Sequence, residues 1–298
     1  LMAAPAEPDR RACTLGVSVV TFAPIKGVLA GTLDSLARAV AGARETGAIG
    51  ETRVTLIDNG PDAADRAVVH AAASSLSSTI GHARVEVLSG HGNVGYGAGH
   101  NLAIARGTWD HHLVLNPDVV IDRHALTAAA TFMEAHPDAA LLAPRVVDEH
   151  GNLQYLCKRY PSPWVLGLRG FAPRPLRARF EGTLARYEMR DLIGDTQVVP
   201  DVPIASGAFM YCRTRALQAV GGFDPRFFLY FEDFDLSLRL ATAGRLYYVP
   251  AIRIVHYGGH TARKGAAHVR MFAASALRFF RKHGWRAPTT ASLVQARL

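Results

Sequence analysis

The first half of the chain alternates short apolar segments with segments of helical character. Aliphatic and β-branched runs that are typical of strands occur at 16–22, 53–60, 83–90, 111–118 and 140–147. Helices are expected between them, at about 32–45, 62–79, 97–107 and 122–136. Strands that alternate with helices form an α/β fold, in which a mostly parallel sheet carries helices on both faces. Such sheets bind ligands at the carboxyl ends of their strands, so we expect functional side chains there.

The pattern changes after about residue 148. The sequence then predicts a hairpin turn at 148–154, loops with short elements over 158–196, a strand at 203–213, a helix at about 233–243, one or two strands over 245–257 that break at Pro250, and an amphipathic helix at 268–285. We therefore divide the chain into a flexible tail (1–14), an α/β half (15–147), a second half of the same domain (148–262), and a C-terminal helix with its tail (263–298).

Composition limits the class of partner. The 298 residues are 49% apolar and 19% charged, which is a globular composition with enough material for a large core. The formal net charge of +8 favours an anionic partner, although an Arg-rich solvated surface would give the same number. Basic residues gathered with stacking aromatics occur only thinly, over 169–190, so no nucleic-acid partner is expected.

Cysteine usage and hydropathy indicate a compartment. Cys13, Cys157 and Cys212 lie far apart without a CxxC spacing, so neither a zinc site nor a disulfide framework is indicated. Reduced thiols fit a cytoplasmic protein. No apolar run approaches the roughly 18 residues that a membrane span needs, and the N-terminus lacks the apolar stretch of a secretory signal.

A glycine-rich loop follows the third predicted strand. Glycines let the backbone approach a ligand closely, and the helix that follows offers free N–H groups to a phosphate. Gly95 and Gly97 are followed by Gly99, so the dinucleotide fingerprint fails and a dehydrogenase is disfavoured. Asn93 and Asn101 bracket the loop with amides that suit a ribose or a base edge, whereas the alternative is a structural turn.

Polar residues also stand at the ends of other predicted strands. Asp58 and Asn59 could meet a pyrimidine base or form an Asx-turn. Asp118 could hold Mg²⁺ or Mn²⁺ on a pyrophosphate, or cap the next helix. His256 ends a later strand, where it is either a structural histidine or a second ligand of the same ion.

The segment 227–244 places carboxylates among aromatic residues. Asp233 and Asp235 could simply cap the helix and complement its dipole. That interpretation leaves the neighbouring rings unexplained, and aromatic faces suit stacking on a sugar; these rings are Phe227, Phe228, Tyr230 and Phe231. A carboxylate beside them could accept the proton of an attacking hydroxyl.

Seven segments occur in an order that resembles a known family. They are "TFAP", "LIDNG", "GNVGYGAGHN", "LNPDVVI", "SGAFMYCR", "GGFDPRFFLYFEDFDLSLRLATAG" and "VPAIRIVHYGGHT". Together, over about residues 15 to 285, they resemble the family-2 glycosyltransferases of the GT-A fold. The likeness is to the rhamnosyltransferases of bacterial O-antigen and cell-wall polysaccharide synthesis.

The resemblance implies an inverting transfer of a sugar to a hydroxyl of a glycan or of a polyprenyl-diphosphate-linked acceptor. L-rhamnose from dTDP-β-L-rhamnose is the expected donor group. A UDP-sugar donor (galactofuranose, N-acetylglucosamine or glucose) and a non-catalytic nucleotide-sugar- or glycan-binding protein of the same fold are the alternatives. A sugar nucleotidyltransferase is disfavoured, because "TFAPIKG" lacks that class's glycines.

The resemblance also implies roles for individual residues. The donor is expected at Thr21, Asp58, Asn59, Asn93, Gly95, Asn101, Asn116 and Gly207, with 15–147 as the nucleotide-sugar-binding half. Asp118 and His256 would hold Mg²⁺ or Mn²⁺, with Asn116 where the family has its first acid. Asp233 would be the base, paired with Glu232, and the acceptor would contact Phe227, Phe228 and Tyr230.

The C-terminal helix suggests one further partner. Its Arg and Lys residues, over 263–286, could lie on the anionic inner face of a bacterial plasma membrane as a peripheral contact. The alternative is a helix that packs on its own core and exposes a wet basic face.

Overall fold

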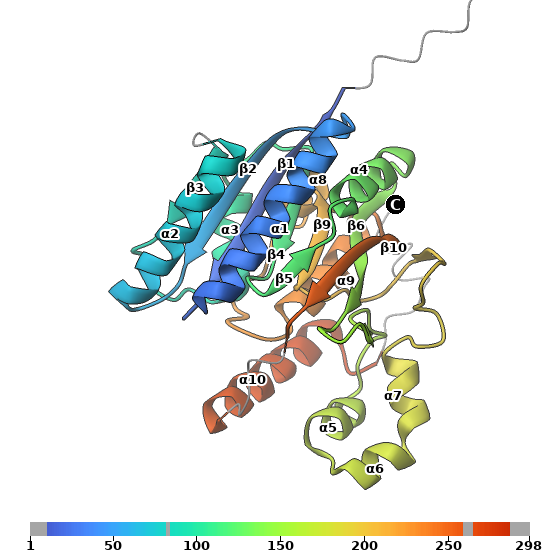
Figure 1. Ribbon diagram of the computed structural model, residues 1–298. Coiled ribbons are helices and arrows are strands. Elements are labelled where there is room, and N and C mark those ends of the chain that lie inside the picture. The colour runs from blue at the N-terminus through green and yellow to red at the C-terminus, as the bar shows by residue number, and fades with distance from the viewer. Residues whose placement is uncertain (1–10, 82–83, 259–264, 287–298) are drawn as a thin grey trace, which may run out of the picture.

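One mixed sheet organises the protein in the computed structural model, which describes residues 11–81, 84–258 and 265–286 (Figure 1). Its strand order is β3-β2-β1-β4-β9-β6-β10-β5. The first four strands run parallel; they are β1 (Cys13–Thr21), β2 (Ile49–Asp58), β3 (Val85–Leu88) and β4 (His111–Leu115). The predicted α/β class, with a central sheet and helices around it, is confirmed, but the sheet is mixed: the pairings among β1 to β4 and of β6 with β10 are parallel, and the others are antiparallel.

The remaining strands come mostly from the second half of the chain. They are β5 (Val119–Ile121), β6 (Ala139–Val147), β7 (Leu153–Gln154), β8 (Val199–Pro200), β9 (Phe209–Arg213) and β10 (Arg245–His256). β9 lies antiparallel between β4 and β6, whereas β10 runs parallel to β6. Because β9 is reversed, the segment that precedes it lies beside the segment that follows β4, and the Asn116 N–H donates to Ala208 O at 2.9 Å.

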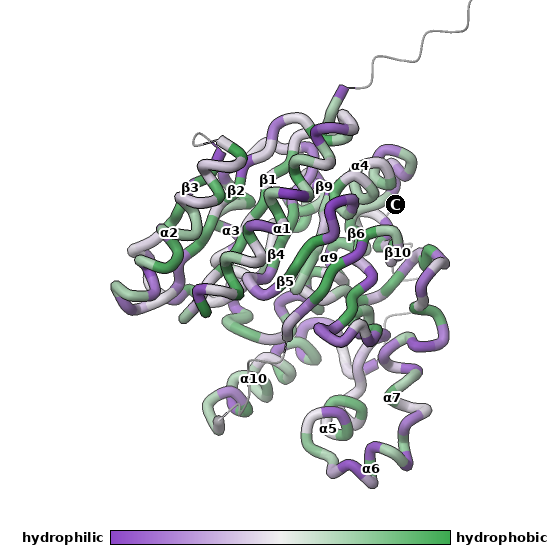
Figure 2. The backbone as a smooth tube through the Cα atoms, in the orientation of Figure 1, coloured by the Kyte–Doolittle hydropathy of each residue, from purple (hydrophilic) through white to green (hydrophobic). Residues whose placement is uncertain are grey.

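Helices cover both faces of the sheet. The core on one face is shared with α1 (Lys26–Glu45), α2 (Ala63–Ile80) and α4 (Ala125–Ala135). The core on the other face includes residues of α3 (Tyr96–Ile104), α8 (Thr214–Ala219) and α9 (Glu232–Ala243). The strands between them are mostly hydrophobic, as the green of the central sheet in Figure 2 shows.

A smaller lobe and the last helix lie below the sheet in Figure 1. The lobe contains α5 (Pro163–Phe171), α6 (Arg174–Arg179) and α7 (Glu181–Tyr187), and the last helix is α10 (Ala266–His283). A third core joins α5, α7, α9 and α10 through aromatic residues such as Phe231 and Phe279. The catalytic candidates on α9 are therefore held from two sides, by the sheet and by α10.

Several element boundaries differ from the sequence prediction. α1 begins at Lys26 rather than near 32, and β9 begins at Phe209 rather than at 203. The stretch 245–257 is one strand, and the predicted break at Pro250 is a shift of its register with β6 between Val249 and Arg253. The loops expected over 158–196 contain three short helices.

The C-terminal helix is less amphipathic in place than its sequence suggests. Phe279 and Phe280 are buried, but Val269 and Ala273, which share their face of the helix by spacing, are exposed. Within the described ranges, no helix combines the length and apolarity that crossing a bilayer requires. The N-terminal tail up to residue 10, the basic residues at 263–264 and the tail beyond 286 lie outside the described residues.

Candidate active site

Two neighbouring cavities open at the carboxyl ends of the strands. The first, the strand-end cavity, has a volume of about 570 Å³ and is lined by Asn59, Asn93, Asn116 and Asp118 among others. The second, the acid-pair cavity, has a volume of about 810 Å³ and contains Glu232 and Asp233. His268 of α10 lines both, so the two cavities share a wall. Each volume is in the range of small-molecule sites.

The ends of β1 and β2 form the floor beside the strand-end cavity. Asp58 is buried, and its Oδ1 accepts from the Gly60 N–H at 3.0 Å, which is the Asx-turn that the sequence left open. Its buried Oδ2 lies 3.5 Å from Arg66 Nε and has no hydrogen-bond partner in the described part of the chain. Thr21 is also buried and donates to Ile57 O at 3.2 Å. Asn59, rather than these two, lines the cavity.

The glycine-rich loop lies against the segment before α9. Gly95 has φ +90°, and a Cβ there would stand 2.5 Å from Phe228 O. Asn93 Oδ1 accepts from the Gly95 N–H at 3.0 Å, and Asn59 Nδ2 donates to Gly95 O at 3.0 Å. Asn93 and Asn59, both predicted to bind the donor, therefore also form hydrogen bonds that hold the glycine-rich loop in place.

Asn101 lies away from both cavities. Its amide Nδ2 donates to Phe223 O at 2.7 Å, and its Oδ1 accepts from the Phe223 N–H at 2.9 Å. The side chain thus uses both ends of its amide to fix one residue of the segment before α9. The structure assigns Asn101 a positioning contact in place of the direct donor contact expected from the sequence.

A chain of hydrogen bonds connects the two cavities. Tyr96 Oη donates to Asn116 Oδ1 at 2.8 Å and also lies 2.7 Å from Gly207 O. The Gly207 N–H in turn donates to Asp233 Oδ2 at 2.9 Å. Gly207 has little room, because a Cβ would lie 3.2 Å from the Tyr96 ring and 3.4 Å from Asp233 Cβ. The position of the candidate base is therefore linked to the residues at the end of β4.

Asp118 and His256 come together across the sheet. His256 Nε2 lies 3.4 Å from Asp118 Oδ1, which is buried and has no hydrogen-bond partner among the residues that the structure describes. The imidazole Nδ1 faces Gln154 Oε1 at 3.4 Å. A carboxylate oxygen and an imidazole nitrogen this close, with the oxygen unpartnered, fit a divalent cation. Among the described residues no group of three or more His, Cys, Asp or Glu could hold a metal ion, so other ligands would come from substrate or water.

Glu232 and Asp233 form an interacting carboxyl pair. Burial raises the pKa of Glu232 well above its usual value, and the charge of Asp233 raises it further. Burial also raises the pKa of Asp233, against the hydrogen bonds that its carboxylate accepts from the backbone N–H groups of Gly207 and Phe234. Since two adjacent buried charges repel, we assign the proton of the pair to Glu232 and the charge to Asp233.

A strained turn delivers this pair to the cavity. Tyr230 and Phe231 have φ values of +69° and +66°, a left-handed conformation that is uncommon for bulky residues. Such conformations cost on the order of 1–3 kcal/mol each and persist where the surroundings impose them. The Tyr230 hydroxyl lies 2.9 Å from His268 Nδ1, and the ring of Phe231 packs in the core.

The predicted aromatic platform is only partly present. Phe228 lines the strand-end cavity and Tyr230 lines the acid-pair cavity. Phe227, however, is fully buried in the core between α9 and α10, so it cannot stack on a sugar and that prediction is wrong. The alternation of exposed and buried rings follows from the turn, which the sequence does not reveal.

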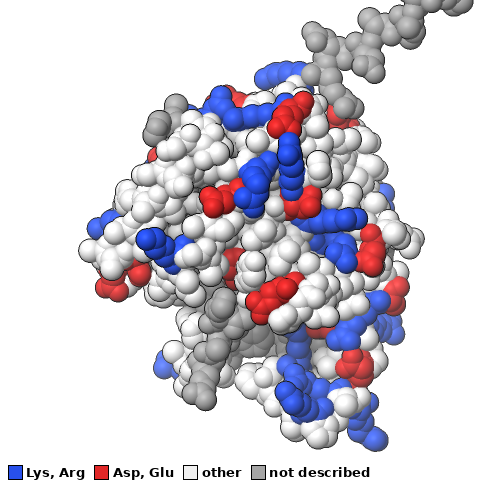
Figure 3. Space-filling model, in the orientation of Figure 1, with Lys and Arg blue, Asp and Glu red and all other residues white. Residues whose placement is uncertain are grey.

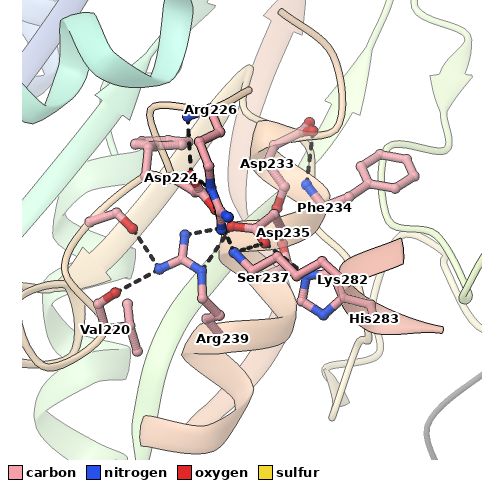
Figure 4. A network of polar contacts seen from close by, with 12 residues as sticks. Val220, Asp224, Arg226, Asp233, Phe234, Asp235, Ser237, Arg239, Lys282 and His283 are labelled. Atoms are coloured by element: carbon pink, nitrogen blue, oxygen red, sulfur yellow. Dashed lines mark hydrogen bonds and ion pairs between the residues drawn. The ribbon is translucent and has the colours of Figure 1, made fainter. Parts of the chain in front are cut away.

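Asp235 has a structural role. It is fully buried, and its carboxylate contacts Arg239, Lys282 and His283 (Figure 4). Burial acts to raise its pKa, but these partners outweigh burial and hold the pKa below the usual value. Of the three acids in the segment, one therefore attaches α10 to α9, and the two others face the cavity.

Sequence reasoning missed two residues of this site. Tyr96, which joins Asn116 to Gly207, stands inside the quoted glycine-rich motif, and a tyrosine between two glycines was the available signal. Tyr187 lines the acid-pair cavity with a buried hydroxyl that has no partner. It lies in the stretch without a clear period, so no signal pointed to it.

Comparisons with known proteins agree with this site. The family described as "Glycosyltransferase like family 2" matches residues 17–282. The N-acetylglucosaminyl-diphospho-decaprenol L-rhamnosyltransferase of Mycobacterium tuberculosis is 32% identical over 220 residues, which cover 68% of this chain and 70% of the relative. Rhamnosyltransferase WbbL of Escherichia coli (strain K12) is 29% identical over 197 residues, which cover 61% of this chain and 67% of the relative.

Solved structures share the fold at low sequence identity. The mannosyltransferase PcManGT from Pyrobaculum calidifontis, in complex with GDP-Man and Mn²⁺, aligns with a TM-score of 0.60 and 15% identity, over 97% of this chain and 70% of that one. GalNAc-T7 with UDP, GalNAc and Mn²⁺ aligns with a TM-score of 0.58 and 14% identity, over 97% of this chain and 54% of that one. The resemblance stated from the seven segments is thus confirmed. With a family match over nearly its whole length and a fold shared with sugar-transferring enzymes, the chain belongs to the family-2-like glycosyltransferases and is an enzyme of the GT-A fold.

Proposed function

We propose that the protein transfers L-rhamnose from dTDP-β-L-rhamnose, with inversion, to a hydroxyl of a lipid-linked glycan. The hydrogen-bonded path from Asn116 through Tyr96 and Gly207 to Asp233 is the observation that carries this proposal. It supports a role for the Asp233 carboxylate as a proton acceptor, because it links that carboxylate to a residue that lines the strand-end cavity. The rhamnosyltransferase relatives, one of them named for a decaprenyl-diphosphate acceptor, support the choice of sugar and acceptor.

The reaction is a single displacement between the cavities. The donor occupies the strand-end cavity, with its base near Asn59 and its sugar near Gly207. The acceptor hydroxyl lies in the acid-pair cavity, where Asp233 accepts its proton. The freed oxygen bonds to the anomeric carbon from the face opposite the diphosphate, and the bond from that carbon to the diphosphate oxygen breaks. The electron pair leaves with the nucleoside diphosphate.

The neighbours of Asp233 set the orientation and the pKa of its carboxylate, and both suit a general base. Two backbone N–H groups orient its carboxylate, while burial raises its pKa and so makes it a stronger base than an exposed aspartate. Glu232, protonated beside it, can donate a hydrogen bond without adding a second negative charge. Positioned general bases of this kind contribute about 10²- to 10⁴-fold in rate.

Asp118 and His256 would hold Mg²⁺ or Mn²⁺ at the diphosphate. Asp118 Oδ1, without a hydrogen-bond partner among the described residues, and the nearby imidazole suit such an ion, and two neighbours in the fold were solved with Mn²⁺, one with UDP and one with GDP-Man. When bound, the cation would offset the negative charge that develops on the leaving diphosphate. The remaining polar residues of the strand-end cavity orient the donor.

Paired substitutions test the proposed roles. We expect Asp233→Asn to lower kcat by at least about 10²-fold, since the base is lost, while stabilisation of the fold by the nucleotide sugar survives. Glu232→Gln keeps the neutral, donating state of its neighbour, so it should stay within about tenfold of the wild type. The measurement is turnover of dTDP-rhamnose beside UDP-galactofuranose, UDP-N-acetylglucosamine and UDP-glucose.

The outcomes separate the parts of the proposal. Asp233→Asn within about threefold of wild-type kcat would remove the base from the mechanism. Turnover of a UDP sugar in place of dTDP-rhamnose would keep the chemistry and replace the donor. Binding of every donor without turnover would point instead to a nucleotide-sugar-binding protein.

A further inference from the structure

The acid-pair cavity also has a basic wall, formed by Lys158, Arg169 and Arg177. Lys158 is buried at 5% exposure, whereas the two arginines come from α5 and α6 and reach the cavity from the solvent side. On the face shown in Figure 3, blue Lys and Arg atoms gather over the lobe that these helices form. A transfer of a neutral sugar to a neutral hydroxyl does not need this wall.

The protein neutralises the basic wall incompletely. Glu188 Oε1 lies 3.3 Å from Lys158 Nζ and 3.2 Å from Arg169 Nε, and its Oε2 also contacts Arg190. The single negative charge of Glu188 is therefore shared among three positively charged side chains. In the described part of the chain, no ion pair involves Arg177. Burial, and after it the charge of Arg169, lower the pKa of Lys158 to about 8, although the charge of Glu188 acts to raise it.

A second feature of the cavity lacks a partner. Tyr187 is only 4% exposed, and within the described ranges of the chain its hydroxyl has no hydrogen-bond partner. The Lys158 ammonium lies 5.7 Å from the centre of its ring. Burial raises the pKa of Tyr187; the charge of Arg169 acts to lower this pKa, and the charge of Asp233 acts to raise it. The hydroxyl therefore lies close enough to both the basic wall and the carboxyl pair to interact with their charges. A buried hydroxyl without a protein partner is uncommon, and a ligand oxygen or a water molecule that enters the cavity would satisfy it.

Apolar side chains complete the cavity on the solvent side. Phe171 and Val269 line it with exposures of 63% and 42%, and Leu166 and Phe272 lie among the other lining residues. The cavity thus combines a carboxyl pair, a cationic wall and an exposed apolar rim. A ligand that matches all three carries a hydroxyl, an anion and a hydrocarbon chain.

We propose that Lys158, Arg169, Arg177 and the Tyr187 hydroxyl bind the diphosphate of a prenyl-diphosphate-linked acceptor. The sugar of that acceptor then lies at Asp233, and its prenyl chain follows Phe171 and Val269 out of the cavity. Guanidinium groups and buried hydroxyls are the donors that phosphate oxygens accept from. This inference rests on the proposed transferase function, because it assigns the substrate class of the same site.

Binding of a sugar-free probe tests the subsite without relying on turnover. Calorimetry with geranyl diphosphate and with geraniol, on the full chain in EDTA, compares ligands that differ only in the diphosphate. We expect the wild type to bind the diphosphate at least about tenfold more tightly than the alcohol. Arg169→Gln/Arg177→Gln should weaken diphosphate binding by about 10- to 100-fold, the size expected for lost charge-assisted hydrogen bonds, and should leave geraniol unaffected.

Two further variants sharpen the test. Arg174→Gln is the matched control, because it removes a charge from α6 at a residue that does not line the cavity. Tyr187→Phe removes only the unpartnered hydroxyl and should weaken diphosphate binding while sparing geraniol. Equal affinity of the wild type for the two probes, binding of neither, or an equal loss in Arg174→Gln would overturn the proposal. Because the readout is binding, a failure here leaves the Asp233→Asn result to judge the transferase function separately.

Discussion

Replacing Asp235 with asparagine should destabilise the protein strongly. The buried carboxylate lies 2.5 Å from Lys282 Nζ and 2.7 Å from both His283 Nε2 and Arg239 Nη2. Breaking a buried ion pair by removing one partner costs about 3–5 kcal/mol, because the other charge stays buried without compensation. Lys282 keeps Asp224 at 2.7 Å, and Arg239 keeps two backbone carbonyls, so we expect the lower end, about 3 kcal/mol.

Urea unfolding and thermal melting measure this loss. A loss of about 3 kcal/mol corresponds to a fall in Tm of about 5 °C for a chain of 298 residues. Asp201→Asn is the matched control, since Asp201 pairs with Arg245 at 2.6 Å on the surface, with 54% of its side chain exposed. Exposed pairs contribute about 0.2–1 kcal/mol. An Asp235→Asn variant that loses no more than the Asp201→Asn control would refute the reasoning.

Acid dependence provides an independent check of the same network. Because the partners of Asp235 hold its pKa below the usual value, the unfolded chain binds a proton there more readily than the folded chain does. The contribution to stability is therefore complete above the unfolded pKa of about 3.9, and it is lost as the pH falls below that value. The free energy of unfolding of Asp235→Asn should accordingly depend less on pH in this acid window.

Two further predictions concern the strand-end cavity. Chelation with EDTA should abolish transfer, and Mg²⁺ or Mn²⁺ should restore it; full activity in the chelator would contradict this. His256→Ala should raise the metal concentration for half-maximal activity by about tenfold or more, and His150→Ala, at an exposed histidine, is the control. Gly95→Ala should destabilise the fold by more than Gly90→Ala in urea unfolding, because both have positive φ but only the first would meet Phe228 O, at 2.5 Å. Equal losses in the two variants would show that this close approach does not matter.

The sequence was most informative at the ends of the strands. Apolar runs identified β1, β2, β4 and β6, and the polar residues that follow β2 and β4, Asn59 and Asn116, marked one edge of the sheet. No local pattern joins Asp118 to His256, which lies far along the chain, so their positions at strand ends offered a shared ion only as one alternative, and the family resemblance favoured it. The structure brings them within 3.4 Å because β5 and β10 are neighbouring antiparallel strands.

The burial of individual aromatic residues and the helices of the small lobe could not be predicted from the sequence, because both depend on tertiary packing. Phe227 and Phe228 are adjacent and chemically identical, yet the first is fully buried and the second is 42% exposed, because a left-handed turn follows them. The lobe of α5 to α7 lacked a clear period because its helices are too short to show a stripe. Only the cap of α5 was readable: Ser162 accepts from the Val165 N–H, with Pro163 at the first position.

The phenol of Tyr96 has a consequence for the order of events. One hydroxyl contacts both the amide at the end of β4 and the carbonyl of the glycine whose N–H holds the Asp233 carboxylate. Any donor that shifts Asn116 therefore acts, through one rigid ring, on the orientation of Asp233. Kinetically, such a linkage favours a compulsory sequence in which the nucleotide sugar enters first and the acceptor meets a base that is already aligned.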